Sequence, residues 1–292
     1  MLKVNSNYRS KRFPYWLRQS VRTDDAVRDT KELIRDLRLN TVCQSAQCPN
    51  IYDCFAKKRC TFLLLGNRCT RNCRFCAVEK RKTQTLQAPQ KEELFNIKEA
   101  VRRLDLRKVV ITSVTRDDLS DGGAGHFAEC IEILKGLSAG LDIEVLVPDF
   151  LGKKESIEKV VSGGPRGFSH NVETVPRLFT RVRPEAEYQR SLDAIRYAKE
   201  IAPWLITKSG LMVGLGETRK EVYNVMKDLK ESGCDIITIG QYLMPNPHCL
   251  EVEEFLHPDE FVQFSKWARE LGFEKFSCSP FTRSSKEGIW QS

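Results

Sequence analysis

The sequence predicts an α/β fold in which buried strands alternate with amphipathic helices. Short, continuous apolar runs recur along the chain, and segments with apolar residues at helical spacing follow them about six times. The apolar runs do not alternate with polar residues, and strands buried on both faces of a parallel sheet show this pattern. Periodicity alone leaves both an open doubly wound sheet and a full or partial barrel possible.

The elements follow from these runs in chain order. We expect strands at residues 61–65, 109–112, 143–147, 168–172, 211–213 and 236–239, the first of them ended by Gly66. Apolar spacing predicts helices at about 27–39, 94–104, 127–134, 157–161, 192–198, 222–229 and 261–271. The chain has 292 residues, a length that suits either two domains or one large α/β barrel.

The composition excludes several classes of protein. Apolar residues make up 41% and charged residues 29% of the chain, which is typical of globular proteins and excludes wholesale disorder. No stretch approaches about eighteen uninterrupted apolar residues, so we expect no membrane-spanning helix. The first residues lack the apolar segment of a secretory signal, so we expect an intracellular protein.

The net charge is +8, from 47 basic and 39 acidic side chains. This balance suits an acidic partner, but taken alone it decides nothing, and a solvated basic surface is the favoured explanation. A basic stretch at Lys80, Arg81 and Lys82 is a candidate for contacting such a partner.

Cysteine is the unusual feature of the composition. The chain has eleven cysteines, and seven of them fall between positions 43 and 76. Without a secretory signal, metal ligation is a better interpretation of this cluster than a disulfide framework, and an odd count prevents complete pairing. We expect Cys130, Cys234, Cys249 and Cys278 to be small buried hydrophobic residues.

The first candidate metal site is the C-x3-C-x2-C triplet Cys69, Cys73 and Cys76, which follows the first expected strand. Active sites of parallel α/β folds assemble in such loops. Three thiolates suit a cubic four-iron cluster whose fourth iron stays open to a substrate or cofactor. A structural zinc site, which needs a fourth ligand, and inert thiols are the alternatives. The flanking Arg71 and Arg74 either offset the negative charge of a cluster or lie exposed.

The second candidate metal site is the C-x4-C-x5-C triplet Cys43, Cys48 and Cys54. Its spacing differs from that of the first triplet, which indicates a separate site rather than a duplication. The nearby Cys60 is an alternative ligand.

The two triplets together resemble the lipoyl synthase family of the radical S-adenosylmethionine (SAM) superfamily. Further matching runs lie at residues 66–69, 110–119, 144–150, 170–175, 208–218, 239–243 and 283–285, so the resemblance spans about residues 12–285. It implies a partial parallel (β/α)6 TIM-like barrel of the radical SAM type with N- and C-terminal extensions. Residues 1–60 would carry the auxiliary iron–sulfur cysteines, residues 61–275 the barrel, and residues 276–292 the C-terminal tail with its Arg-Ser-Ser motif.

The resemblance also implies a reaction and two 4Fe–4S clusters. Cys69, Cys73 and Cys76 would bind the cluster whose open iron chelates SAM, and SAM cleavage would give a 5′-deoxyadenosyl radical. That radical would abstract hydrogen from C6 and C8 of an octanoyl chain amide-linked to a lysine of a lipoyl carrier domain. Cys43, Cys48 and Cys54, with Ser285 as an oxygen ligand, would bind an auxiliary 4Fe–4S cluster that is sacrificed as the sulfur donor.

The chemistry of the implied reaction fits these residue types. An unactivated methylene has no acidic proton, so general acid–base catalysis has nothing to remove, and radical cofactors supply this chemistry instead. A serine oxygen is a poorer ligand for a soft iron site than a thiolate, which we interpret as suiting an iron that must leave. The alternative for Ser285 is an exposed hydroxyl in the tail.

Other positions resemble SAM-binding segments of the superfamily. The run Gly210-x-Met212-x-Gly214-x-x-Glu217 resembles a segment that lines the adenine, although a strand-to-helix turn with Glu217 near the helix N-terminus explains it as well. The resemblance places Asn171 and Glu173 at the SAM ribose or amino group, and Ser113 and Thr115 at its methionine part. An ordinary strand-end role is the alternative for these four residues.

The partners that the resemblance implies are octanoylated lipoyl carrier domains, namely 2-oxoacid dehydrogenase E2 subunits and the glycine cleavage H protein. A flavodoxin or ferredoxin would supply electrons, and an iron–sulfur carrier would rebuild the auxiliary cluster. We expect no nucleic-acid partner and a cytoplasmic location, or an organellar matrix if the source is eukaryotic.

Two rival functions and one departure from the family pattern remain at this stage. A tRNA-methylthiolating enzyme would suit the +8 charge, but no added RNA-binding module is evident. A zinc-binding interaction module is the non-enzymatic alternative. The family usually continues its Arg-Ser-Ser motif with tyrosine, whereas Lys286 stands here and puts the local packing of the tail in question.

Overall fold

The computed structural model describes residues 13–19, 24–80, 85–138 and 140–290. Their main sheet is parallel throughout and has the strand order β1 (Thr61–Leu64), β4 (Lys108–Ser113), β5 (Asp142–Leu146), β6 (Gly167–Ser169), β7 (Ile206–Val213), β8 (Ile236–Gln241) and β9 (Lys275–Cys278). Strand neighbours in the sheet are therefore neighbours in the chain. The order begins at β1 and ends at β9 without closing, which makes the sheet a partial barrel.

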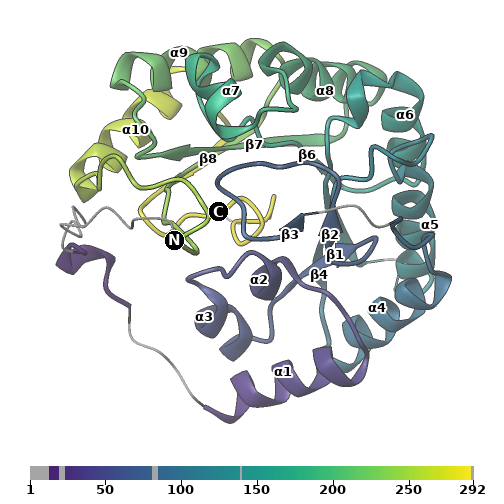
Figure 1. Ribbon diagram of the computed structural model, residues 1–292. Coiled ribbons are helices and arrows are strands. Elements are labelled where there is room, and N and C mark those ends of the chain that lie inside the picture. Colours follow the sequence, from purple (N-terminus) through teal and green to yellow (C-terminus); the bar gives the residue numbers. More distant parts are fainter. Residues whose placement is uncertain (1–12, 20–23, 81–84, 139, 291–292) are drawn as a thin grey trace.

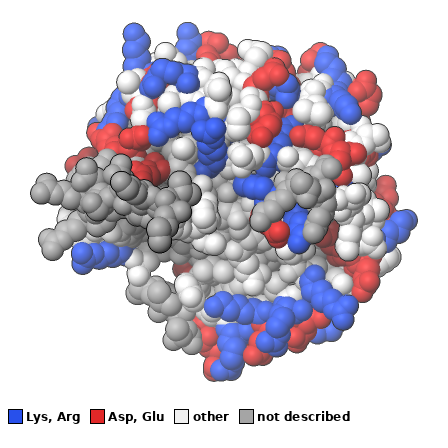
Figure 2. All heavy atoms as spheres, viewed as in Figure 1, with Lys and Arg blue, Asp and Glu red and all other residues white. Residues whose placement is uncertain are grey.

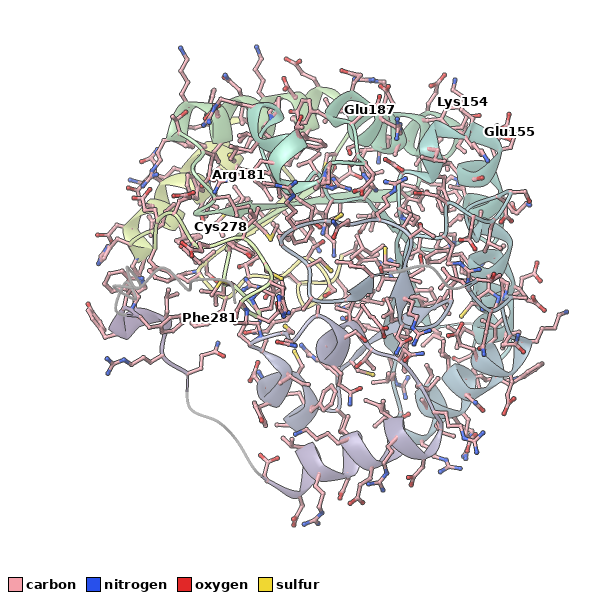
Figure 3. All side chains as sticks on the ribbon, in the orientation of Figure 1. Lys154, Glu155, Arg181, Glu187, Cys278 and Phe281 are labelled. Carbon is pink, nitrogen blue, oxygen red and sulfur yellow. The ribbon has the colours of Figure 1, made fainter. Side chains whose placement is uncertain are left out.

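Helices surround this sheet on the outside (Figure 1). One or two helices follow each strand from β1 to β8, which gives six strand–helix units. These helices are α4 (Lys91–Arg103), α5 (Ala124–Lys135), α6 (Lys154–Ser162), α7 (Phe179–Val182), α8 (Tyr188–Ile201), α9 (Arg219–Glu231) and α10 (Pro258–Glu270). Charged side chains such as Lys154, Glu155 and Glu187 lie on the outer surface of this ring (Figure 3).

The predicted strands and long helices are confirmed, because each carries an apolar face that the fold buries. Phe62, Leu63 and Leu64 of β1 are nearly inaccessible, as is every residue of β8. On α9, the buried face consists of Val222, Val225, Met226 and Leu229. A capping box between Thr218 and Glu221 begins that helix.

Strand β9 is a seventh strand that the sequence did not predict. Its residues Lys275–Cys278 are only partly buried, because β9 is an edge strand that pairs with β8 alone. A continuous apolar run is therefore not required there. Cys278 is for the same reason half-buried rather than buried, and Cys249, in the segment after β8, is also half-buried. The prediction of burial is thus wrong for these two cysteines and confirmed for Cys130 and Cys234.

Three helices before β1 form a layer at one side of the barrel (Figure 1). They are α1 (Asp25–Asp36), α2 (Val42–Ser45) and α3 (Ile51–Ala56), whereas the 3-10 turn η1 (Tyr15–Leu17) lies apart from them, where Trp16 donates to the carbonyl of Leu256. The two short helices carry Cys43 and Cys54. Helix α1 packs on α3, where the Thr30 hydroxyl donates to the carbonyl of Phe55.

Two further short 3-10 turns, η2 (Phe150–Gly152) and η3 (Pro176–Leu178), and a small parallel pair, β2 (Arg68–Cys69) with β3 (Glu79–Lys80), lie between the main elements. Of the basic stretch after residue 79, Lys80 belongs to β3, while Arg81 and Lys82 lie outside the described residues. Among the described helices, none is both long and apolar enough to span a membrane.

Candidate active site

A cavity of about 320 Å³ opens at the carboxyl ends of the barrel strands. Residues at or just after the carboxyl ends of β4, β5 and β6 line it, such as Ser113, Val147 and His170. Parallel barrels place their active sites at this end, because the loops after all the strands converge there. Cys69, Cys73 and Cys76 line this cavity, and so do Cys48 of the second triplet and Ser285 of the tail. The fold thus brings both predicted metal sites to one space.

The first triplet lies in the loop that follows β1. Leu65 and Gly66 begin this loop with positive φ angles of 67° and 84°. The carboxylate of Glu93 accepts hydrogen bonds from both backbone amides, at 2.9 and 3.2 Å. At the far side, the backbone amide of Thr115 donates to the sulfur of Cys69 at 3.3 Å. The loop therefore leaves the sheet in a fixed direction.

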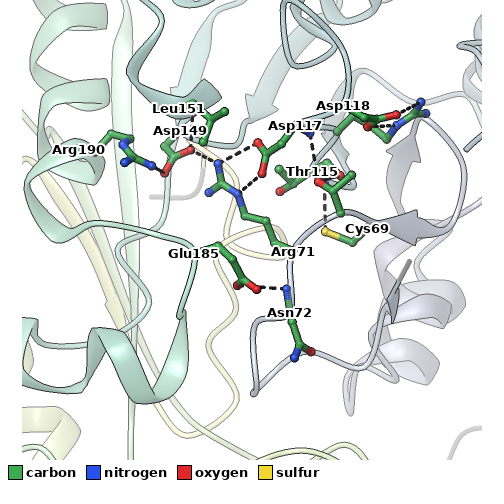
Figure 4. Close-up of polar contacts among 12 residues, drawn as sticks. Cys69, Arg71, Asn72, Thr115, Asp117, Asp118, Asp149, Leu151, Glu185 and Arg190 are labelled. Carbon is green, nitrogen blue, oxygen red and sulfur yellow. Dashed lines mark hydrogen bonds and ion pairs between the residues drawn. The ribbon is translucent and has the colours of Figure 1, made fainter. Parts of the chain in front are cut away.

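Arg71 is the buried centre of this loop (Figure 4). Its side chain is 3% exposed and donates to both oxygens of Asp117, at 2.7 and 3.0 Å, and to Asp149 at 2.5 Å. Burial by itself raises the pKa of Asp149, but the hydrogen bond and charge of Arg71 outweigh it and lower that pKa to about 2. Arg71 thus ties the cluster loop to the segments after β4 and β5, whereas Arg74 lies exposed.

The second triplet gathers between α2 and α3. Cys43 and Cys54 are buried on these helices, and Cys48 lies on the loop between them at the cavity. Burial raises the pKa of the Cys43 thiol to about 12 and that of Cys54 to about 11, and the charge of Cys48 adds to both shifts. The alternative ligand Cys60 is also within electrostatic range of Cys43 and Cys54. Thiols of this kind become thiolates when a metal binds them.

The C-terminal tail joins this second triplet. The side-chain amide of Asn50 donates to the carbonyl of Phe281 at 2.8 Å, and Lys286 pairs with Asp53 at 3.4 Å. Ser285 therefore lies on the wall of the cavity rather than exposed. Lys286, which replaces the family's usual tyrosine, has a defined partner in Asp53, next to Cys54.

The rest of the cavity wall fits a polar ligand. Several buried side-chain atoms on this wall have no hydrogen-bond partner in the described structure. They are Ser113 Oγ, His170 Nε2, Asn171 Oδ1, Arg183 Nε and Ser284 Oγ. Leaving such atoms unpaired is costly, so a ligand that bonds to them is favoured. Thr115 and Glu173 also line the cavity, and burial raises the pKa of Glu173.

Gly214 and Glu217 are not among the residues that line the cavity. Both oxygens of Glu217 accept hydrogen bonds within its own turn, from the amides of Gly214 at 2.5 Å and Leu215 at 3.0 Å. Gly214 has a φ of 101°, and a Cβ atom there would collide with Gln241. The strand-to-helix turn that the sequence also allowed thus accounts for both residues.

His170 and Arg183 belong to the cavity wall although their sequence positions did not reveal it. Burial lowers the pKa of His170 to about 4, and the charge of Arg183 adds to this shift. His170 stands beside Asn171 in a run that resembles the family, which was the available signal. Arg183 donates to the backbone carbonyls of Asn171 and Val172, so its place depends on packing after β6.

The arrangement of the thiols bears on which metal they suit. Among the described residues, no three His, Cys, Asp or Glu side chains are grouped as the ligands of a single metal ion. Ligands to different irons of one cubic cluster lie further apart than ligands to one ion. The first triplet, on the cavity wall, and the second triplet, which reaches the wall through Cys48, are both compatible with clusters of this kind.

Comparison with known proteins defines the class. The sequence model of the Radical SAM superfamily matches residues 63–229. Solved structures with the same fold include methylornithine synthase PylB, with a TM-score of 0.57, 16% identity and coverage of 85% of this chain and 74% of that one. SuiB from Streptococcus suis, bound to S-adenosylmethionine, has a TM-score of 0.54 at 12% identity, covering 78% and 54%. The chain belongs to the radical SAM superfamily, and its partial barrel is the fold of that class.

Curated relatives then identify the family. The chain is 52% identical over 274 residues to a lipoyl synthase from Caldanaerobacter subterraneus subsp. tengcongensis, covering 94% of this chain and 95% of the relative. It is 51% identical over 272 residues to a lipoyl synthase from Caldicellulosiruptor saccharolyticus, covering 93% and 94%. The chain belongs to the lipoyl synthase family. It is a sulfur-inserting radical SAM enzyme that uses SAM and two 4Fe–4S clusters.

Proposed function

We propose that this chain inserts sulfur at C6 and C8 of an octanoyl chain attached to a lysine of a lipoyl carrier domain, with the auxiliary cluster as the sulfur source. When bound, the SAM-chelating cluster supplies an electron that cleaves SAM to a radical able to abstract hydrogen from an alkyl chain. The observation that supports this proposal is that one cavity is lined by the whole first triplet, by Cys48 of the second triplet and by Ser285. A radical made at one site can then reach a chain held beside the other.

We assign Cys69, Cys73 and Cys76 to the SAM-chelating cluster, and Cys43, Cys48, Cys54 and Ser285 to the auxiliary cluster. The two sets come from the loop after β1 and from the two ends of the chain. Residues 1–60 and 276–292 are therefore proposed as two extensions that together build the auxiliary site on the barrel of residues 61–275.

SAM has an amino group, a carboxylate, ribose hydroxyls and an adenine, and the unpaired atoms of the cavity match this polar surface. We assign Ser113, Thr115, Asn171 and Glu173 to SAM contacts. Gly214 and Glu217 would act indirectly, by shaping the turn after β7.

The apolar part of the wall suits the alkyl chain. Leu63, Phe75, Val114, Leu211 and Met212 contribute to it. Apolar side chains offer the octanoyl chain a favourable surface and keep water from the reacting carbons.

The proposed substrates are octanoylated E2 subunits of 2-oxoacid dehydrogenases and the glycine cleavage H protein. A flavodoxin or ferredoxin and an iron–sulfur carrier are the proposed auxiliary partners, and the cytoplasm or an organellar matrix the proposed location. Lys and Arg lie interspersed with Asp and Glu on the face shown in Figure 2, so carrier docking would depend on local pairs of charges.

The test is the amount of iron, sulfide and zinc per chain after anaerobic reconstitution, followed by an octanoyl-carrier assay with SAM. Two clusters give about eight iron and eight sulfide per chain. About four iron would contradict the auxiliary site, and zinc with negligible iron would favour a zinc-binding module instead. A Cys130→Ala chain is the matched control, because Cys130 is buried on α5 and does not line the cavity.

A further inference from the structure

The C-terminal tail runs into the barrel interior rather than over its surface (Figure 1). After β9, the amide of Gln241 on β8 donates to the carbonyl of Pro280, which turns the tail inward. Further along, the side chain of Ile289 occupies the space inside Gly167 on β6: a Cβ atom on that glycine would lie 2.6 Å from Cδ1 of Ile289. Trp290 then reaches the start of β4, where the ammonium group of Lys108 lies over its ring. The tail therefore passes from the cavity towards the opposite end of the barrel.

A buried ion pair lies inside the barrel, where the tail passes. Lys208 of β7 and Glu144 of β5 pair with each other, and both side chains are completely inaccessible to solvent. The interior of a parallel barrel is usually filled by branched apolar side chains. Taking a lysine and a glutamate out of water is costly unless further hydrogen bonds satisfy both groups.

The tail supplies those hydrogen bonds. The ammonium group of Lys208 donates to the carbonyl of Ser284 at 2.7 Å and to that of Glu287 at 3.0 Å, in addition to its bond with Glu144. A lysine has three donors, and all three are thereby used. Glu144 accepts from the amide of Ile289 at 2.9 Å and from the hydroxyl of Ser169 at 2.7 Å.

The two carbonyls that Lys208 binds stand on either side of residues 285 and 286. Fixing both of them fixes the backbone of Ser285 between them. These bonds come from β5 and β7, not from the cysteines of the second triplet, so they do not depend on a bound cluster.

We infer that Lys208 and Glu144 are positioning residues that dock the tail and set Ser285 at the auxiliary site before iron arrives. The inference rests on the proposed role of Ser285 as an auxiliary ligand. It separates two functions within the tail: the buried pair anchors the tail, and Ser285 meets the cluster.

The test compares three variants of the full-length chain. Lys208→Met with Glu144→Gln removes both charges at similar volume, so that neither charge is left buried alone. Gly167→Ala pushes on Ile289 without altering any charge, and its backbone is not in the left-handed region. Gly136→Ala, at the end of α5, is the matched control, because the added Cβ meets nothing closer than 3.4 Å and lies on the outer helical layer.

Hydrogen exchange is read first on the chain without iron. We expect amides of residues 285–290 to be protected in the wild type and in Gly136→Ala, and to lose protection by at least about tenfold in the two anchor variants. After reconstitution, we expect the anchor variants to hold about four iron instead of about eight, while SAM cleavage persists. Persistent SAM cleavage shows that the barrel and first cluster are intact, which loss of fold would not allow.

Tail amides that stay protected in both anchor variants would overturn the inference, as would a full iron content in either. If the double variant does not fold, the hydrogen exchange and the iron content of the Gly167→Ala chain alone test the inference. A wild-type chain that binds only about four iron atoms would instead contradict the proposed auxiliary site. Hydrogen exchange on the iron-free chain would still test whether Lys208 and Glu144 hold the tail in place.

Discussion

Replacing Arg71 by methionine should destabilise the chain strongly, because it leaves the buried carboxylate of Asp149 without its main ion-pair partner. Arg71 is 3% exposed, and its partner Asp149 is fully buried. Without Arg71, Asp149 keeps only the amide of Leu151 at 3.1 Å and Arg190 at 3.5 Å. Removing one partner of a buried ion pair costs about 3–5 kcal/mol. We expect a loss of that size in the free energy of unfolding.

The assay is urea unfolding of the iron-free chain under anaerobic conditions, monitored by circular dichroism. Arg177→Met is the control. Arg177 also forms a bidentate ion pair, with Glu221, but its side chain is 55% exposed, so its loss should cost far less than that of Arg71. Adding Asp149→Asn to Arg71→Met removes the stranded charge and should recover about 1–2 kcal/mol. Equal costs for Arg71→Met and Arg177→Met would refute the reasoning.

Three further predictions concern the site and its surroundings. Cys48→Ala should lower bound iron from about eight to about four per chain but preserve SAM cleavage, whereas Cys69→Ala should abolish SAM cleavage; equal effects on both readouts would contradict the assignment. The pKa of His170 is lowered to about 4 by burial, so the unfolded chain takes up a proton below about pH 6.5 while the folded chain does not. Stability should therefore fall as pH drops from 6.5 towards 4, by up to about 3 kcal/mol, and His170→Gln should remove this slope in unfolding titrations; an unchanged slope would show that another group causes it. Lys286→Met should cost less than about 1 kcal/mol and leave iron content unchanged, because its pair with Asp53 is partly exposed at 3.4 Å; loss of the second cluster would show that Lys286 is more than a local contact.

The sequence allowed prediction of those strands that are buried on both faces of the sheet. β1 and β8 are buried along their whole length, and apolar residues predominate at positions 62–64 and 236–239. Strand β9 was missed because an edge strand can keep polar residues such as Lys275 and Ser277. The short helices α2 and α3 were missed because fewer than two turns give no readable periodicity.

The site was predictable where its residues are close in sequence. Thiol spacing indicated two candidate cysteine clusters, because metal ligands from one loop are near neighbours in the chain. The choice of Cys43, Cys48 and Cys54 over Cys60 came from the family resemblance. Pairs that the fold assembles from distant strands left no such signal. Lys208 of β7 meets Glu144 of β5, and Arg71 after β1 meets Asp149 after β5, only because the curved sheet brings together strands that are not adjacent. Each of these charged residues looks like an ordinary surface position until its burial is known.

The origin of the inserted sulfur tests the central claim most directly. The chain would be reconstituted with heavy-isotope sulfide, mixed with SAM, a reductant and an octanoyl-lysyl peptide for a single turnover, and the product analysed by mass spectrometry. We predict that both sulfur atoms in the product carry the isotope, and that Cys48→Ala yields no such product. Unlabelled sulfur in the product, or no insertion by a chain that binds both clusters and cleaves SAM, would contradict the account.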